Sequence, residues 1–140
     1  MDRTSFYKGQ SFLALVFFIG GILSISAILI ASLALSNVDT GYGIAASFRA
    51  EAVATAGAED GLLQIDRQGS YFSAAAPGYT VALGSSTAAT VTVTQNSPGS
   101  GFATILSAAT VSGHTRKISV VVSENPSTGQ TNVVSWADVQ

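Results

Sequence analysis

The longest pattern in the chain is an uncharged stretch that runs from residue 9 to residue 38. Within it, residues 12–35 form 24 positions of mainly apolar or small side chains, and 15 of these are Leu, Ile, Phe or Val. A helix that rises about 1.5 Å per residue covers roughly 36 Å over this span, enough to cross a hydrocarbon core of about 30 Å. The pattern therefore predicts a transmembrane helix over residues 10–38.

This stretch is typical of a membrane anchor that is kept, because a cleaved secretory signal has an apolar part of only about 7–15 residues. Its 15 large apolar residues favour insertion by about 5–9 kcal/mol in total, taken as an upper bound. The cations Arg3 and Lys8 precede the span, and the next cation is Arg49. The positive flank predicts a cytoplasmic N-terminus and a C-terminal domain on the other side of a single-pass anchor.

Small residues recur inside the apolar stretch at steps of four, three, four and three, which places them along one face of a helix. They are Gly20, Ser24, Ala27, Ala31 and Ala34. Such a stripe lets two helices approach closely in a membrane and predicts a helix-packing face. The alternative is that small residues are simply frequent in membrane helices, so that the stripe arises by chance.

The next segment, residues 39–68, predicts a second, amphipathic helix. Gly41 and Gly43 weaken or break the first helix, or the two helices are continuous through a softened segment. From residue 44 to 67 the chain is rich in Ala, and the predicted apolar face consists of Phe48, Ala52, Thr55, Ala58 and Leu62. The charged residues of this helix predict a solvated surface. A sharper alternative is that Glu51 or Glu59 pairs with a neighbouring subunit.

Residues 69–140 change to a strand pattern. Residues 89–94 alternate strictly between apolar and polar, and further extended runs occupy 79–83, 102–111, 117–123 and 133–137. Residues 112–115 predict a hairpin turn, and Pro- or Gly-bearing loops lie at 97–99 and 125–129. The runs predict an antiparallel sheet of four or five strands, with 79–83 and 133–137 as the outer ones. Such a small sheet needs a cover, which the Ala-rich helix can supply. The predicted fold is α+β, with Phe102 and Trp136 in the core.

Composition bounds the chemistry of the chain. It has no Cys and hence no disulfide, a net charge of −2, and only 10% charged residues, so that it has no basic field for nucleic acid. His114 is the single histidine, expected in a turn, and Arg116 with Lys117 is the only adjacent basic pair. A solvated strand start explains this pair better than contact with DNA, which needs several such cations. We expect no catalytic, cofactor-binding or metal site and no enzymatic activity.

The junction before the apolar stretch, Lys8-Gly9-Gln10-Ser11-Phe12, resembles the processing site of type IV pilins and pseudopilins. The resemblance implies a leader over residues 1–9, cleavage by a prepilin peptidase after Gly9, and methylation of the new N-terminal amine of Gln10. The segment from Ala56 to Leu62 is similar to the helix that follows the anchor in minor subunits of this family. The implied architecture is a long helix laid on an antiparallel sheet.

One departure from the pattern concerns the fifth position of the mature chain. Major pilins have a Glu there, which neutralises the terminal amine of a neighbouring subunit, whereas this chain has Ala14. The resemblance therefore implies a minor pilin or pseudopilin, a structural subunit without a cofactor. Its partners would be other pilin-like subunits, the prepilin peptidase and the inner membrane, and its destination a filament at the cell surface. A subunit of a secretion system would look the same.

The alternative reading without the family is a signal-anchored surface protein whose β-rich domain binds a ligand or a partner. In that case the Gly9-Gln10 junction is a coincidence. Replacing Gly9 by a bulky residue would then leave localisation and function unchanged.

Overall fold

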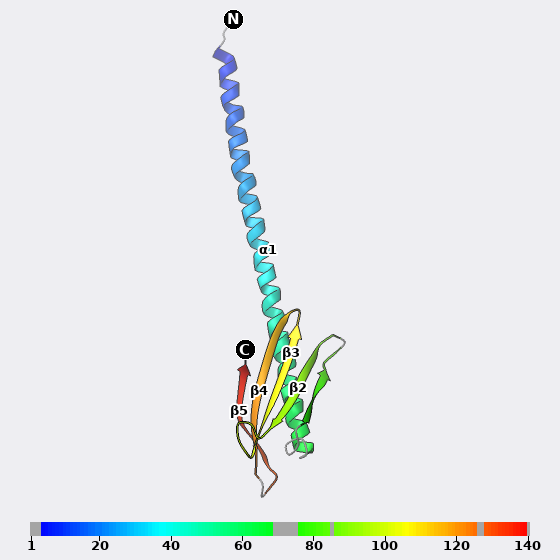
Figure 1. Ribbon diagram of the computed structural model, residues 1–140. Coiled ribbons are helices and arrows are strands. Elements are labelled where there is room, and N and C mark those ends of the chain that lie inside the picture. Colours follow the sequence, from blue (N-terminus) through cyan, green and yellow to red (C-terminus); the bar gives the residue numbers. More distant parts are fainter. Residues whose placement is uncertain (1–3, 69–75, 85, 126–127, 140) are drawn as a thin grey trace. The chain divides into compact units, whose positions relative to one another are not determined.

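The computed structural model describes residues 4–68, 76–84, 86–125 and 128–139, although the side chains of residues 4–11, 76 and 77 are outside this description. The fold is α+β, with one long apolar helix followed by five strands (Figure 1). The chain divides into two compact units, residues 1–42 and residues 43–140. The elements are α1 (Thr4–Arg67), β1 (Ala76–Ala82), β2 (Ala88–Gln95), β3 (Phe102–Val111), β4 (His114–Glu124) and β5 (Thr131–Val139).

Helix α1 runs for 64 residues and continues through Gly41 and Gly43. Of the two alternatives, a break or a continuous helix, the structure has the continuous one. A glycine inside a helix costs only about 1 kcal/mol relative to alanine, and long helical segments on both sides offset that cost. The boundary between the two compact units still falls here, between Tyr42 and Gly43.

The strands form one antiparallel sheet in which each strand pairs with the next along the chain, in the order β1 to β5. The five predicted extended runs are confirmed, since each falls within or overlaps one strand. The hairpin between β3 and β4 is tighter than predicted, because His114 already pairs with Val111 and begins β4. Ser112 and Gly113 alone make the turn, with φ angles of 48° and 82°. Two such residues match the twist of the flanking strands, which explains the short connection.

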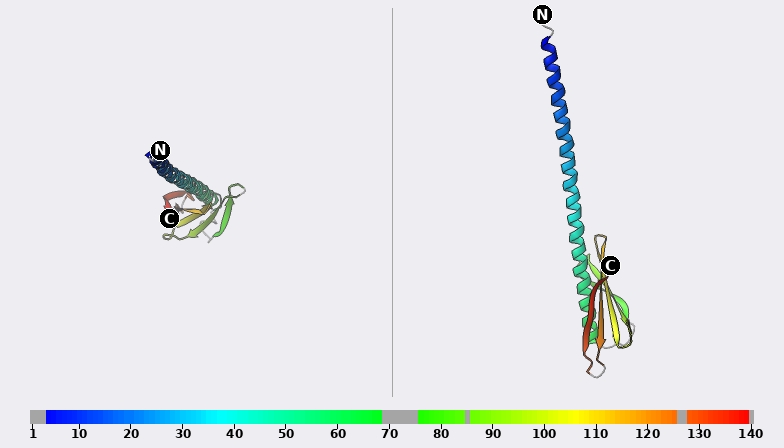
Figure 2. Two further views of the ribbon diagram at one scale, coloured as in Figure 1. Left: turned by 90° about the horizontal axis from the view of Figure 1, so that it is seen from above. Right: turned by 90° about the vertical axis from the view of Figure 1, so that its left-hand side faces the viewer.

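The core of the second unit lies between α1 and one face of the sheet, as Figure 2 shows for the green part of the helix. The sheet contributes the large side chains, among them the fully buried Val91, Ile105 and Val120. Full burial of each such side chain contributes about 1.5–3 kcal/mol. The helix contributes small residues until its last turn. Its buried positions are Ala46, Ala50, Ala54, Gly57, Ala58, Gly61 and Ile65.

The predicted apolar face of this helix is therefore wrong. Phe48 is 66% exposed, Ala52 is exposed, and Thr55 and Leu62 are only partly buried, so that Ala58 alone is in the core. Close approach explains the difference. A Cβ atom on Gly57 would meet the hydroxyl of Ser107 and lie 2.6 Å from the Cβ of Ala89, and one on Gly61 would lie 2.7 Å from Ile105 Cγ2. At these two glycines no larger helix residue fits against the sheet, whereas Ile65 fits at the last turn and Phe48 lies on the exposed side of the helix.

Strand β5 is an edge strand that the helix leaves uncovered. Every residue of it after Thr131 is exposed, including Trp136, which is 43% exposed. The prediction of a core Trp136 is wrong, and Phe102 is only partly buried. One helix about 10 Å wide covers two or three strands spaced about 4.8 Å apart, so a five-stranded sheet retains an open edge.

Candidate assembly surfaces

The predicted processing site, the bond between Gly9 and Gln10, lies within helix α1. Gly9 and Gln10 have helical backbone, but their side chains lie outside the described part of the chain, as do residues 1–3 altogether. Ala14, at the position where major pilins have a Glu, is exposed on the helix. Cleavage after Gly9 and methylation of Gln10 stay predictions.

The N-terminal part of α1 is long and apolar enough to cross a membrane once. None of the residues in its most apolar 18-residue segment is buried in the structure. Phe17 is 75% exposed and Ile30 is 71% exposed. A core helix of a globular protein buries such side chains. The span is therefore a candidate for a single membrane crossing, while its orientation stays a prediction.

The predicted packing face has the geometry that a close helix contact requires. At about 100° per residue, its five members lie within an arc of about 80°, and all of them are exposed. A Cβ atom added to Gly20 would meet nothing within 4 Å. The bulky residues Phe18, Ile22 and Ile25 are exposed as well, so burial does not single out one face. The packing role of Gly20, Ser24, Ala27, Ala31 and Ala34 stays a prediction.

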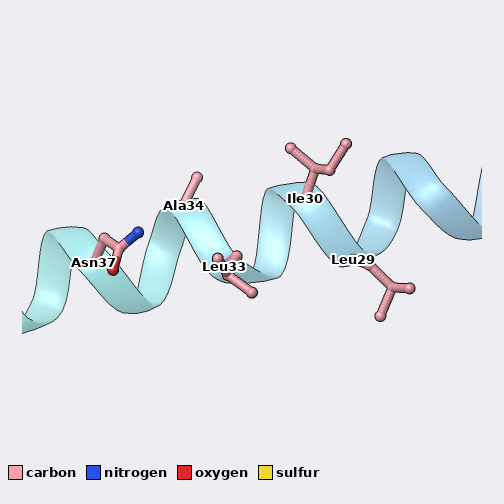
Figure 3. Close-up of a pocket in the computed structure, with 5 residues that line it drawn as sticks. All are labelled: Leu29, Ile30, Leu33, Ala34 and Asn37. Carbon is pink, nitrogen blue, oxygen red and sulfur yellow. The ribbon is translucent and has the colours of Figure 1, made fainter.

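A shallow hollow of about 350 Å³ lies at the C-terminal end of the stripe. Figure 3 shows Ile30 and Ala34 projecting from one side of the helix while Leu29 projects from the other. The methyl group of Ala34 is shorter than its neighbours and leaves a depression between them. Such a depression can receive a side chain from a second helix, as holes do in packed helix pairs. The lining residues are Leu29, Ile30, Leu33, Ala34 and Asn37.

Two of the three serine hydroxyl groups in residues 12–35 are satisfied within the helix. Ser24 Oγ donates to the carbonyl oxygen of Gly20, and Ser26 Oγ donates to that of Ile22, both at 2.9 Å. In hydrocarbon an unsatisfied hydroxyl is costly, and bonding to the preceding turn removes that cost without a second helix. Ser24 therefore presents a small side chain whose donor is already used.

The part of α1 in the second unit has an exposed back that faces away from the sheet. A shallow hollow of about 410 Å³ on this back is lined by Phe48, Glu51, Ala52, Thr55, Ala56 and Glu59. Asp60 differs from the other charged residues of this helix segment because it contacts the sheet. Its Oδ2 accepts a hydrogen bond from Tyr79 Oη of β1 at 2.8 Å. Arg49, Glu59 and Asp66 are exposed, as the predicted solvated surface requires.

The basic pair on β4 does not form one patch. Arg116 Nε donates to Ser47 Oγ at 3.0 Å, and its Nη1 lies 3.3 Å from Asp138 Oδ2, so this side chain ties β4 to α1 and to β5. Lys117 follows on the opposite face, because side chains alternate along a strand, and it is exposed. The imidazole of His114 lies beside Gly43, 3.6 Å from where a Cβ would be.

Sequence reasoning missed one regularity on the exposed back of the helix. Arg49 and Arg67 are 18 residues apart, which is five full turns, so both side chains leave the helix in the same direction. Both residues are exposed. This spacing is visible in the sequence, but it becomes informative only once the structure shows which face the sheet covers.

The described ranges contain no group of three or more His, Asp or Glu side chains that could hold a metal ion. Comparisons with known proteins gave no match, whether to protein-family models, to curated proteins or to solved structures.

Proposed function

We propose that this chain is a structural subunit, a minor pilin or pseudopilin, of a type IV pilus-like filament. A prepilin peptidase cuts it after Gly9, and the exposed N-terminal helix then packs against the helices of other subunits. The junction Gly9-Gln10 at the start of an apolar helix carries the proposal through its resemblance to prepilin processing sites. The α+β layout, a long helix on an antiparallel sheet, is consistent with it.

The exposure of the apolar helix supports this function. Large side chains such as Phe17, Ile30 and Leu33 are about two-thirds exposed or more, and neither water nor the sheet can provide them with a stable partner. A bilayer covers them before assembly, and neighbouring helices cover them in a filament. The small residues of the stripe and the hollow at Ala34 allow the close contacts that drive helix association in an apolar medium.

Ala14 supports a minor role within the filament. Without a carboxylate at this position, the chain cannot neutralise the terminal amine of a neighbour, so that a fibre made of this chain alone would contain uncompensated charges. The chain therefore functions among other subunits, as an initiating or capping component.

Mass spectrometry of the chain purified from cells with an active prepilin peptidase tests this function directly. We expect a mature N-terminus at Gln10 with one added methyl group. Replacing Gly9 by Leu should leave the leader attached and keep the chain out of filaments. An unprocessed chain that begins at Met1 in such cells would contradict the proposal.

The exposed strand β5 favours one alternative, a signal-anchored surface protein with a partner-binding domain. Val133, Val134 and Trp136 are between 43% and 57% exposed, which suits a strand that meets a partner. Under this alternative Gly9→Leu changes neither localisation nor function, whereas Trp136→Ala abolishes binding. The two substitutions therefore separate the two functions.

A further inference from the structure

The sheet has two edge strands, β1 and β5 (Figure 1), and only one of them is protected against pairing with a further strand. Strand β1 contains Pro77, which has no backbone N–H, and its register with β2 shifts between Ala76 and Tyr79. Both features interrupt a row of hydrogen-bonding groups. Strand β5 contains no Pro, Gly or Lys; its register with β4 shifts once, before Ser135, and is regular from there to Val139. The regular part of β5 therefore lacks the usual features that prevent strand addition.

The register of the hairpin between β3 and β4 indicates which backbone groups of β5 are free. His114 pairs with Val111 across a two-residue turn, an arrangement in which the N–H of His114 points to β3. Backbone groups alternate in direction along a strand, so the N–H of Ser119, five residues later, points to β5. Ser119 pairs with Ala137, which therefore points back to β4. The residues on either side of Ala137 point the other way.

These residues, Trp136 and Asp138, direct their N–H and C=O groups away from the sheet, and no described strand pairs with this side of β5. Their side chains lie on the face of the sheet that carries the core, because they pair with Val120 and Ile118, which are buried there. The indole of Trp136 is still exposed, whereas Asp138 already pairs with Arg116. The edge thus presents backbone hydrogen-bonding groups beside an aromatic ring, with no unpaired charge among its described residues.

We propose that β5 binds an extended segment of another protein, which adds to the sheet as a further strand antiparallel to β5. Hydrogen-bonded pairs form at Trp136 and Asp138, and a side chain of the segment covers the exposed face of the indole. The segment alternates apolar and polar residues, with an apolar residue opposite Trp136. The edge is the same in both candidate functions, so this inference goes beyond the proposed function and rests on neither.

A second copy of this chain fits the edge less well than a segment of another protein. Strand β1 of a second copy carries the interruptions at Pro77 and at the register shift. In an antiparallel pair of β5 strands, a two-fold axis would relate the copies. Gly43 lies beside His114, at one end of the sheet, so the two Gly43 residues would lie at opposite ends of the paired sheets. Both lead into candidate spans of one membrane, which disfavours this pair.

Trp136 is the single tryptophan of the chain, so its fluorescence reports directly on this edge. The probe is a peptide of about seven residues that alternates valine and threonine, titrated into the full chain in detergent micelles. N-methylation of every second residue leaves the peptide one hydrogen-bonding edge and prevents its aggregation. We expect the emission of Trp136 to shift to the blue, and hydrogen exchange to slow at the amides of Trp136 and Asp138 but not in β1. The same peptide methylated at every residue should have neither effect.

Two variants of Asp138 form a matched pair that tests the backbone contact. Asp138→Pro removes the outward N–H and Asp138→Ala keeps it, whereas both remove the ion pair with Arg116. Proline is tolerated on an edge strand where its missing N–H would face solvent, so the sheet should stay folded in both variants, as circular dichroism can verify. We expect Asp138→Pro to bind the peptide about two- to tenfold more weakly than Asp138→Ala, because one hydrogen bond is lost.

The inference is wrong if the peptide with one free edge neither shifts the emission nor slows exchange in β5, or if the two variants of Asp138 bind it equally. Exchange in β5 that slows without peptide as the concentration of the chain rises would assign the edge to a second copy and would also contradict the inference. The N-terminus found by mass spectrometry is an independent result. Failure of cleavage after Gly9 contradicts only the proposed function, and failure of peptide binding contradicts only this contact.

Discussion

Small residues form a stripe in both compact units, but the surroundings of the two stripes differ. In the first unit the stripe from Gly20 to Ala34 is exposed, and a Cβ on Gly20 would meet nothing. In the second unit the stripe from Ala46 to Gly61 is buried against the sheet. In the second unit the small helix residues let the helix backbone approach the sheet closely, and the large apolar side chains of this contact belong to the sheet. The partner of this stripe is therefore the sheet of the same chain, whereas for the exposed stripe of the first unit a partner from another molecule is a prediction.

The largest expected change in stability comes from the sheet residues that pack against the buried helix stripe. Ile105 is fully buried and lies under Gly61. Ile105→Ala should lower the free energy of unfolding by about 2–5 kcal/mol, because it removes apolar contacts and leaves a cavity. Leu106→Ala is the matched control, since Leu106 is next in sequence but 37% exposed, and should cost about 1 kcal/mol or less. Chemical denaturation of the full chain in detergent, followed by circular dichroism, measures both, and equal losses would contradict the assignment of the core.

The helix side of the same contact gives the next largest effect. Gly57→Ala should destabilise the second unit by about 1–3 kcal/mol, because the new methyl group overlaps Ser107 and Ala89. This loss opposes the gain of about 1 kcal/mol that alanine normally brings to a helix. Gly43→Ala is the control, because its methyl group would lie at an ordinary 3.6 Å from His114, and it should stabilise the helix. If both variants are stabilised in the same denaturation experiment, the close approach at Gly57 is wrong.

The residues of the helix–sheet contact also show why the sequence predicts the order of helix and strands better than it predicts which side chains pack together. The alternation at residues 89–94 reports directly which side chains of β2 are buried, and the layout of helix and sheet follows from it. The predicted helix face is wrong, because a pattern of large apolar residues favours Phe48, which is exposed, over the glycines that approach the sheet. The exposure of Trp136 depends on the width of the sheet relative to one helix, a tertiary property that its local sequence does not contain.

Some features of the candidate surfaces can likewise be predicted from the sequence, and others need the structure. The stripe and the junction at Gly9 are periodic or local patterns, so the sequence alone predicts them. The common direction of Arg49 and Arg67 needs the structure, because their spacing is informative only when the sheet is known to cover the other side of the helix.

The exposed stripe can be tested by replacing one of its small residues with a large one, which prevents two helices from approaching closely. Ala31→Leu should weaken association of the full chain in bilayers about tenfold, since a large side chain keeps the helix backbones apart. Ser32→Leu is the control, because it enlarges the next residue, which lies off the stripe. Energy transfer between labelled copies in vesicles measures the association. Equal weakening by both substitutions, or by neither, would show that the stripe is not the packing face.

The smallest effect concerns Ser107, the polar residue buried in the contact with the helix. Its side chain is fully buried, and its Oγ has no hydrogen-bond partner among the described residues. A buried hydroxyl without a partner costs free energy, so Ser107→Ala should raise the free energy of unfolding by up to about 1 kcal/mol. Ser119→Ala, on the outer face of β4, should change it by less than about 0.5 kcal/mol. Ser107→Val should instead destabilise, because its added methyl groups would be forced against Gly57, whose surroundings already exclude a single Cβ. If Ser107→Ala is destabilising in the same denaturation assay, the hydroxyl has a partner and the contact between helix and sheet is more polar than its geometry indicates.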